Sequence, residues 1–96
     1  MNRQQALKAL ADAKSPLQQR FGVTRLALFG STARDTAKLD SDVDVLVAFD
    51  GPATSNRYFG VQFYLEDILC APVDLVSERA LRPELRAAVE RELIDV

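Results

Sequence analysis

Segments of helical and extended hydrophobic periodicity follow one another along the chain. Residues 2–14 place alanine and leucine side chains at helical spacing, which predicts a short amphipathic helix. Ser15-Pro16 predicts an interruption, because serine favours the N-cap position and proline the first turn of a new helix. We therefore expect a second short helix, which Phe21-Gly22 ends.

Short apolar runs between the helical segments predict the strands of a sheet. Residues 26–29 and 73–76 are mostly apolar, and residues 43–49 are rich in β-branched side chains and apolar on both faces. The last three residues, 94–96, have the composition of a short edge strand. Together these runs predict a sheet of three or four strands.

Two further helices are predicted in the second half of the chain. Residues 56–69 have helical period, and their aromatic side chains fall on more than one face. A last helix begins at Pro83, while Ser31 and Ser77 each begin a helical turn. This alternation of elements predicts one domain over residues 1–96, of the α/β or α+β class, with helices packed on the sheet.

Composition narrows the class of protein. A chain of 96 residues with 48% hydrophobic residues can form one core without disulfides. The net charge of −2 excludes a strongly basic protein, so no direct contact with nucleic acid is expected. The single Cys70 is predicted to be a small core residue in a reducing compartment. Without an apolar signal segment or a run near the roughly 20 residues of a membrane span, a cytoplasmic protein with no membrane contact is expected.

The sequence contains no histidine. The usual general base and the most common metal ligand are therefore excluded. Any catalysis must use carboxylates, hydroxyls, amines or a bound metal ion.

Aspartates gather at the start of one predicted strand and recur in another. Side chains two residues apart in a strand share a face, with Cα atoms roughly 6.5 to 7 Å apart, so Asp42 and Asp44 can converge on divalent cations. Asp74 lies within the apolar run 73–76, where burial of a lone carboxylate is costly unless it is paired or metal-bound. If the two strands are neighbours, three carboxylates form an all-oxygen cluster that suits Mg²⁺ or Mn²⁺.

Gly30-Ser31 supplies a second part of the same predicted site. Glycine permits close approach to the backbone, and the free amides and the Ser31 hydroxyl at the start of a helical turn can hold a phosphate. A strand, a Gly-Ser turn and a carboxylate pair on the next strand therefore predict a nucleoside triphosphate site.

Each part also has a simpler explanation. Gly-Ser is a common turn, acidic pairs at strand ends are often solvated, and Asp74 alone could pair with an arginine. The combination is more specific than any part. An EF-hand loop from Asp40 is excluded, because it needs glycine and glutamate where the chain has Val45 and Gly51. A Walker P-loop is excluded, because Gly-Lys-Ser/Thr does not follow Gly30.

The motif set resembles that of a known family. Gly30-Ser31 with Ala33-Arg34, then Ser41-Asp42-Val43-Asp44, then Asp74 in a short strand resemble the minimal nucleotidyltransferases (the MNT family) of the DNA polymerase β-like superfamily. The resemblance extends from about Phe21 to the C-terminus. It implies an α+β, palm-like nucleotidyltransferase domain, with a mixed sheet of three to four strands and flanking helices.

The resemblance also implies a catalytic metal site. Asp42 and Asp44 would bind Mg²⁺ (or Mn²⁺) and the triphosphate of ATP. Asp74 would be the third acid of the metal site and the candidate to activate the attacking hydroxyl.

The same resemblance implies phosphate contacts. Gly30 and Ser31 would contact the β- and γ-phosphates. Arg34 would either pair with a phosphate or stand exposed on its short helix.

Members of this family are commonly antitoxins encoded beside a ribonuclease toxin with an HEPN domain. Some transfer AMP from ATP onto a tyrosine of that toxin, which inactivates it. The resemblance therefore implies a metal-dependent nucleotidyltransferase with a protein hydroxyl as acceptor. One alternative is an antitoxin that neutralises its toxin by binding alone, for which the second aromatic face of residues 56–69 is a candidate docking surface. Another is transfer to a small molecule such as an aminoglycoside, against which the lack of a second domain counts.

One residue departs from the family pattern. Asp35 stands where the family usually has a glycine, which would permit positive φ and close phosphate approach. Aspartate tolerates the left-handed conformation better than most residues, so the fold is expected to persist. Its charge is expected to weaken nucleotide binding unless Lys38 or a metal ion offsets it.

Overall fold

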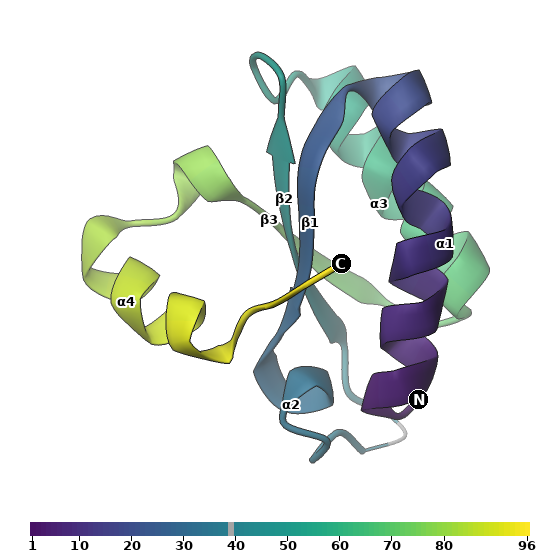
Figure 1. The fold of residues 1–96 in the computed structure, drawn as a ribbon, viewed down its shortest axis with the longest axis vertical. Coiled ribbons are helices and arrows are strands. Elements are labelled where there is room, and N and C mark those ends of the chain that lie inside the picture. The colour runs from purple at the N-terminus through teal and green to yellow at the C-terminus, as the bar shows by residue number, and fades with distance from the viewer. Residues whose placement is uncertain (39) are drawn as a thin grey trace.

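Helices and strands alternate along the chain, as Figure 1 shows. The structure, a computed structural model, describes residues 1–38 and 40–96. The elements are, in chain order, α1 (Arg3–Phe21), β1 (Val23–Phe29), α2 (Gly30–Ala33), β2 (Val43–Phe49), α3 (Ser55–Leu69), β3 (Val73–Ser77), the 3-10 turn η1 (Glu78–Ala80), α4 (Pro83–Glu92) and β4 (Ile94–Asp95). The polar residues 35–41 predict a loop, which lies between α2 and β2, and at Leu39 this prediction falls outside the described residues.

The strands form a mixed sheet. In the described part of the chain the sheet has four strands in the order β3-β2-β1-β4. The pairs β1–β2 and β1–β4 are antiparallel, whereas β2 and β3 are parallel. A parallel pair needs a crossover connection, and α3 supplies it between β2 and β3. The predicted α+β class with a mixed sheet and flanking helices is confirmed.

One face of the sheet carries the hydrophobic core. Helices α1 and α3 lie side by side against this face (Figure 1). Alternate β2 residues, Val43, Val45 and Val47, are buried there with Val73 and Leu75 of β3. Because successive side chains of a strand point to opposite faces, the residues between them point away from α1 and α3. We call these the core face and the open face of the sheet.

Helix α1 passes through the proline at which we predicted an interruption. Pro16 lies inside α1, so the prediction of two short helices is wrong. An interior proline costs about 3 kcal/mol or more. The buried apolar stripe of the continuous helix outweighs this cost, because Leu10 and Leu17 each contribute about 1.5–3 kcal/mol on full burial. The buried stripe of α1 consists of Ala6, Leu10, Ala13 and Leu17.

The ends of α1 and α3 follow local rules. A capping box joins Asn2 and Gln5 at the start of α1, and Gly22, with φ +71°, ends it. Cys70 ends α3 with φ +52° and is exposed. The prediction of a buried Cys70 is therefore wrong, because the left-handed residue that follows α3 turns away from the core.

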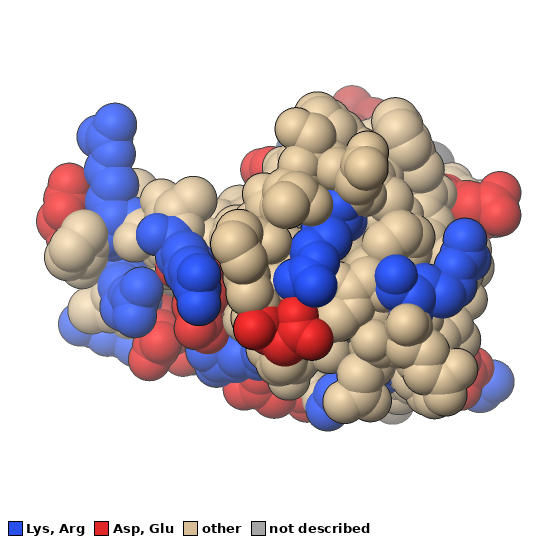
Figure 2. All heavy atoms as spheres, turned by 90° about the horizontal axis from the view of Figure 1, so that it is seen from above, with Lys and Arg blue, Asp and Glu red and all other residues tan. Residues whose placement is uncertain are grey.

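The C-terminal segment, residues 78–96, is attached through backbone pairing of β4 with β1, through packing of Ile94 and Val96 on the core, and through charged groups. In α4, each residue of which the structure describes, no side chain is buried, and Leu85 remains 52% exposed. Residues 78–92 contain four arginines and four glutamates. In the space-filling view from above, positively and negatively charged side chains gather at the end of the molecule where α4 lies (Figure 2).

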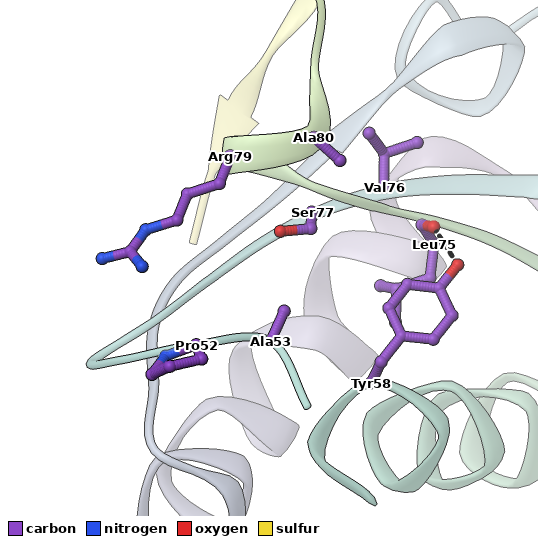
Figure 3. Close-up of a pocket in the computed structure, with 8 residues that line it drawn as sticks. All are labelled: Pro52, Ala53, Tyr58, Leu75, Val76, Ser77, Arg79 and Ala80. Atoms are coloured by element: carbon purple, nitrogen blue, oxygen red, sulfur yellow. Dashed lines mark hydrogen bonds between the residues drawn. The ribbon is translucent and has the colours of Figure 1, made fainter. Parts of the chain in front are cut away.

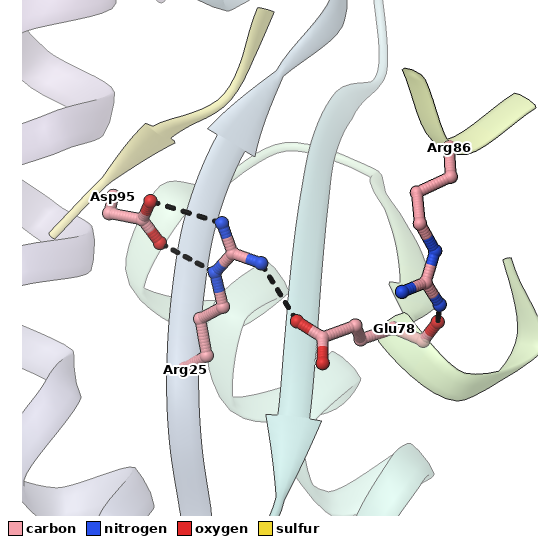
Figure 4. A network of polar contacts seen from close by, with 4 residues as sticks. All are labelled: Arg25, Glu78, Arg86 and Asp95. Atoms are coloured by element: carbon pink, nitrogen blue, oxygen red, sulfur yellow. Dashed lines mark hydrogen bonds and ion pairs between the residues drawn. The ribbon is translucent and has the colours of Figure 1, made fainter. Parts of the chain in front are cut away.

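A network of ion pairs ties this segment to the sheet (Figure 4). Arg25 of β1 donates from Nε to Asp95 Oδ1 at 2.8 Å and from Nη1 to Glu78 Oε2 at 2.8 Å. Arg86 of α4 donates from Nη2 to the carbonyl of Glu78 at 3.3 Å. The pKa of Asp95 is lowered, chiefly by its hydrogen bond from Arg25. The Arg25 guanidinium thus joins the turn η1 to the edge strand β4, which is also paired with β1 through its backbone.

Among the described residues, none of the helices is long and apolar enough to cross a membrane.

Candidate functional site

Two of the predicted acids meet on the open face of the sheet. The parallel register of β2 and β3 places Asp44 opposite Asp74. Both side chains point away from the core, because their strand neighbours are core residues. Asp42 precedes β2 and is exposed. The open face therefore brings Asp44 and Asp74 together at the N-terminal ends of these two strands.

The pKa of the Asp44 carboxyl reflects its partial burial and its proximity to Asp74. Its pKa is raised from 3.8 to about 6, mainly because partial burial disfavours the charged form. The negative charge of Asp74 and a hydrogen bond with it raise the pKa further, and the charge of Asp42 adds a smaller amount. Arg34 acts in the opposite direction. Both neighbouring acids therefore act on Asp44, and a cation beside this carboxylate would relieve the repulsion.

The Asp44 side chain leaves no room for a side chain at Gly30. Strand β1 ends at Phe29, which is paired with Asp44 in the antiparallel register. Gly30 follows with φ +74°, in the left-handed region that favours glycine. A Cβ atom at this position would lie 2.8 Å from Asp44 Cγ. A residue with a side chain at position 30 would therefore have to displace the carboxylate.

Ser31 lies in α2 and does not cap it. The N-cap residue of α2 is Phe29, so the predicted capping role of Ser31 is wrong. The reason is that the helical turn begins one residue early, at Gly30. The carbonyl of Ser31 accepts a hydrogen bond from the amide of Thr36 at 2.9 Å, which closes the loop after α2.

Two of the predicted phosphate ligands contact a residue that the sequence did not indicate. Glu92, the last residue of α4, accepts from the Gly30 amide at 3.2 Å through Oε2. Its Oε1 accepts from Arg34 Nη1 at 2.6 Å, in an ion pair whose side chains are 34% and 52% exposed. Arg34 is therefore exposed, as one of the two alternatives expected, and is paired with Glu92, while its contact with a phosphate stays a prediction. The motif gave no signal for Glu92, because residues 30 and 92 meet only in the folded chain.

Asp35 adopts the conformation that the missing glycine would have provided. Its φ is +61°, as expected for this position of the family pattern. Its Oδ1 accepts from the Arg3 amide at 3.1 Å, and Arg3 Nη1 donates to the Ala33 carbonyl at 3.4 Å. The substitution thus gives the loop after α2 a hydrogen bond to the first turn of α1.

The acids fit a divalent cation by their chemistry, although three of them are not assembled. Asp74 is exposed, which contradicts its predicted burial, because β3 is an edge strand with a neighbouring strand on one side only. Among residues 1–38 and 40–96, no three acidic or cysteine side chains are close enough to hold one ion. Asp44 and Asp74 nevertheless offer adjacent carboxylate oxygens, the ligand type that Mg²⁺ and Mn²⁺ prefer.

A pocket of about 550 Å³ lies elsewhere on the molecule (Figure 3). It is lined by residues that follow β2, such as Pro52 and Ala53, and by the C-terminal part of β3 with Arg79. The Tyr58 hydroxyl donates to the Leu75 carbonyl at its edge. Because Asp44 and Asp74 lie at the other ends of β2 and β3, this pocket is separate from the acidic site.

The aromatic residues of α3 fall on two faces, as predicted. Tyr58 and Tyr64 pack against the core. Phe59 and Phe63 are 49% and 64% exposed, with stacked rings whose centroids are 6.2 Å apart.

Comparison with known proteins identifies the family. The family model described as "Nucleotidyltransferase domain" matches residues 10–96. The chain belongs to this nucleotidyltransferase domain family. It is 40% identical over 83 residues to the protein adenylyltransferase MntA of Thermococcus cleftensis, which covers 86% of this chain and 84% of the relative.

Solved structures agree with this assignment. A structure named as a minimal nucleotidyltransferase is 42% identical, with a TM-score of 0.83 over 100% of this chain and 97% of its own. An MNT antitoxin in complex with a tri-AMPylated HEPN toxin of Shewanella oneidensis is 20% identical, with a TM-score of 0.66 over 95% and 70%. The second likeness is one of fold. The expected family and fold are confirmed, and the chain is a transferase of the nucleotidyltransferase class.

Proposed function

We propose that this protein transfers AMP from ATP onto a tyrosine hydroxyl of an HEPN-domain ribonuclease toxin and thereby acts as its antitoxin. The observation that carries the proposal is the contact of Asp44 with Asp74 beside Gly30, where partial burial and mutual repulsion raise the pKa of Asp44 to about 6. Similarity to a protein adenylyltransferase supports the reaction type. The AMPylated toxin in complex with a fold relative supports the class of partner.

In this proposal the acids hold Mg²⁺ or Mn²⁺. Asp44 and Asp74 supply adjacent carboxylates on the open face, and Asp42 joins them from the exposed end of β2. When bound, the cation neutralises the triphosphate and stabilises the charge that develops on the leaving pyrophosphate. The repulsion that raises the pKa of Asp44 is a physical reason for these residues to attract a cation.

The remaining residues orient the two substrates. The Gly30 amide, the Ser31 hydroxyl and the Arg34 guanidinium donate hydrogen bonds to phosphate oxygens. Asp74 accepts the proton of the attacking hydroxyl. Because Asp74 is exposed on an edge strand, a side chain of a partner protein can reach it from solvent.

A second function, neutralisation of the toxin by binding alone, has one observation in its favour. Glu92 holds the Gly30 amide and the Arg34 guanidinium, two of the donors that a phosphate would need. A protein in which this contact never opened would bind no nucleotide. Such a protein would have to match the toxin in amount.

The deciding experiment replaces one acid and one matched surface aspartate. The protein is mixed with labelled ATP, Mg²⁺ and the HEPN protein encoded beside it, and the mass of the HEPN protein is measured. We expect addition of one or more AMP groups by the wild type and by Asp67→Asn, whose side chain lies exposed on α3. Asp44→Asn should reduce the rate at least about 10²–10³-fold, the usual cost of losing one electrostatic element of the transition state.

The same variants separate the two functions. An enzyme protects cells at substoichiometric amounts, and Asp44→Asn then fails to protect. If the HEPN protein stays unmodified while Asp44→Asn protects cells as well as the wild type, the transfer function is wrong and neutralisation by binding is correct.

A further inference from the structure

We infer that Glu92 is an internal competitor of the nucleotide: its carboxylate occupies the donors of the phosphate side of the site, and α4 must release it before ATP binds. This inference rests on the proposed function for its ligand, a nucleoside triphosphate. It adds a regulatory element that lies outside the Gly-Ser and Asp-x-Asp motifs.

The geometry of Glu92 is that of a bound anion. One carboxylate oxygen accepts from the Gly30 amide at 3.2 Å, and the other accepts from Arg34 Nη1 at 2.6 Å. A backbone amide has a single hydrogen to donate, so it cannot hold Glu92 and a phosphate oxygen at full strength together. A carboxylate at this position also repels an incoming triphosphate.

Helix α4 is attached weakly enough to move away from the sheet. No side chain of α4, which the structure describes in full, is buried. Its contacts to the rest of the protein include the ion pair of Glu92 with Arg34 and the hydrogen bond from Arg86 to the Glu78 carbonyl. Exposed ion pairs contribute little to stability, so detachment of α4 from the sheet costs little free energy. The core lies on the other face of the sheet and is not disturbed when α4 detaches.

Neighbouring anchors make the movement local. Strand β4, directly after α4, is paired with Ala27 and Leu28 of β1, and Arg25 holds both Asp95 and Glu78. These contacts fix the two ends of the segment that contains α4. Residues 81–93 can therefore shift while residues 78 and 94–96 remain attached to the sheet.

The predicted effect is a gain of nucleotide affinity when the competitor is removed. Apparent affinity is reduced by the fraction of molecules in which the site is closed. One exposed ion pair and one hydrogen bond to a charged group together correspond to a closing constant of roughly 20-fold or more. Glu92→Gln should bind ATP with Mg²⁺ more tightly by about this factor, because glutamine lacks the charge that Arg34 attracts.

The test compares Glu92→Gln with Glu90→Gln on the full chain. Glu90 is exposed on the same helix two residues earlier, so its replacement changes the net charge equally. Binding of a non-hydrolysable ATP analogue is measured by calorimetry. Hydrogen exchange of residues 83–92 is followed in parallel, with thermal unfolding as a check that each variant is folded.

We expect tighter binding in Glu92→Gln alone, together with faster exchange of α4 when the analogue binds to the wild type. Equal or weaker binding in Glu92→Gln, or protection of α4 by the analogue, would overturn the inference and assign Glu92 the role of positioning Arg34. Failure of every variant to bind the analogue would overturn it as well. Tight binding by Glu92→Gln without any AMP transfer to the HEPN protein would retain this inference and refute the proposed function.

Discussion

The two faces of the sheet are built from different interactions. On the core face, β2 and β3 bury mainly apolar side chains, under α1 and α3, and the last residue of β3, Ser77, is buried as well. On the open face, the same two strands present Asp44 and Asp74, while β1 presents Arg25. The strands that carry the acids thus also contribute side chains to the core.

This difference separates stability from chemistry. Desolvation of side chains on the core face supplies the free energy of folding, at about 25 cal/mol per Å² of apolar surface. The open face remains partly hydrated, which is why an exposed Asp74 and a half-buried Asp44 are tolerated there. Substitutions on the two faces should therefore differ in both the size and the kind of their effects.

The largest expected effect is on the core face. Leu28 of β1 is fully buried among the residues of the main core. Leu28→Ala should lower the free energy of unfolding by about 2–5 kcal/mol, because it removes buried methyl groups and leaves a cavity. Urea unfolding followed by circular dichroism measures this change. A loss below about 1 kcal/mol would contradict the assignment of stability to this face.

A smaller effect is expected where the open face meets the loop after β1. Gly30→Ala should cost roughly 1–3 kcal/mol, because alanine is strained at φ +74° and its Cβ would push Asp44 aside. Gly51→Ala is the matched control, since its Cβ would make an ordinary contact, at 3.5 Å from Arg57 Nη1. The two unfolding midpoints are compared in urea. Equal stability of the two variants would show that Asp44 does not constrain position 30.

The acids of the open face should also make the free energy of unfolding depend on pH. Because the pKa of Asp44 is raised in the folded protein to about 6, its contribution to stability is fully present below the unfolded value of 3.8 and is lost as the pH rises through about 6. Without divalent cations, Asp44→Asn should therefore gain stability relative to the wild type between about pH 4 and about pH 7. Asp95 has the opposite sign, since its lowered pKa gives stability that is lost as the pH falls.

The Asp44 effect is isolated by subtraction. Unfolding free energies of the wild type and of Asp44→Asn are measured across this pH range in a chelator, and their difference removes Asp95 and all other shared groups. A difference that does not change with pH would mean that the acids of the open face do not repel one another in the folded state.

The smallest effect concerns the charges that hold the C-terminal segment. Arg25→Gln should cost about 1 kcal/mol, because its pairs with Glu78 and Asp95 are partly exposed and such pairs are worth little. Hydrogen exchange should rise chiefly in residues 78–96. Lys8→Gln serves as the control, since its pair with Asp12 is 83% and 74% exposed and its loss should be close to neutral. If Arg25→Gln lowered the free energy of unfolding by several kcal/mol, the open face would contribute as much to stability as the core face, which would contradict this comparison.

Several features of this protein were determined by the sequence itself. The β-branched run of β2 set a strand with the predicted bounds, and the Pro83 and Ser77 signals placed α4 and η1 correctly. These predictions succeeded because each depends on neighbours in the chain, where side-chain period and backbone preference act directly.

Other features were decided by contacts between distant residues. Pro16 remains inside α1 because the buried stripe of that helix packs against the sheet, a gain that local propensity does not include. Asp74 is exposed because β3 forms the edge of the sheet, although its apolar neighbours suggested burial. At both positions the surroundings come from elements far along the chain. Neighbouring residues in the sequence therefore predicted the wrong structure at Pro16 and the wrong burial at Asp74.

The site shows the same division. The sequence specified Gly30, Ser31, Arg34 and the three acids by their spacing. The tertiary structure decided that Asp44 presses on Gly30, that Asp35 bonds to the first turn of α1, and that Glu92 binds the donors beside them. The physical reason is that a motif fixes which groups are available, whereas hydrogen bonds and charge interactions act over a few ångströms in space and depend on where the sheet brings distant segments together.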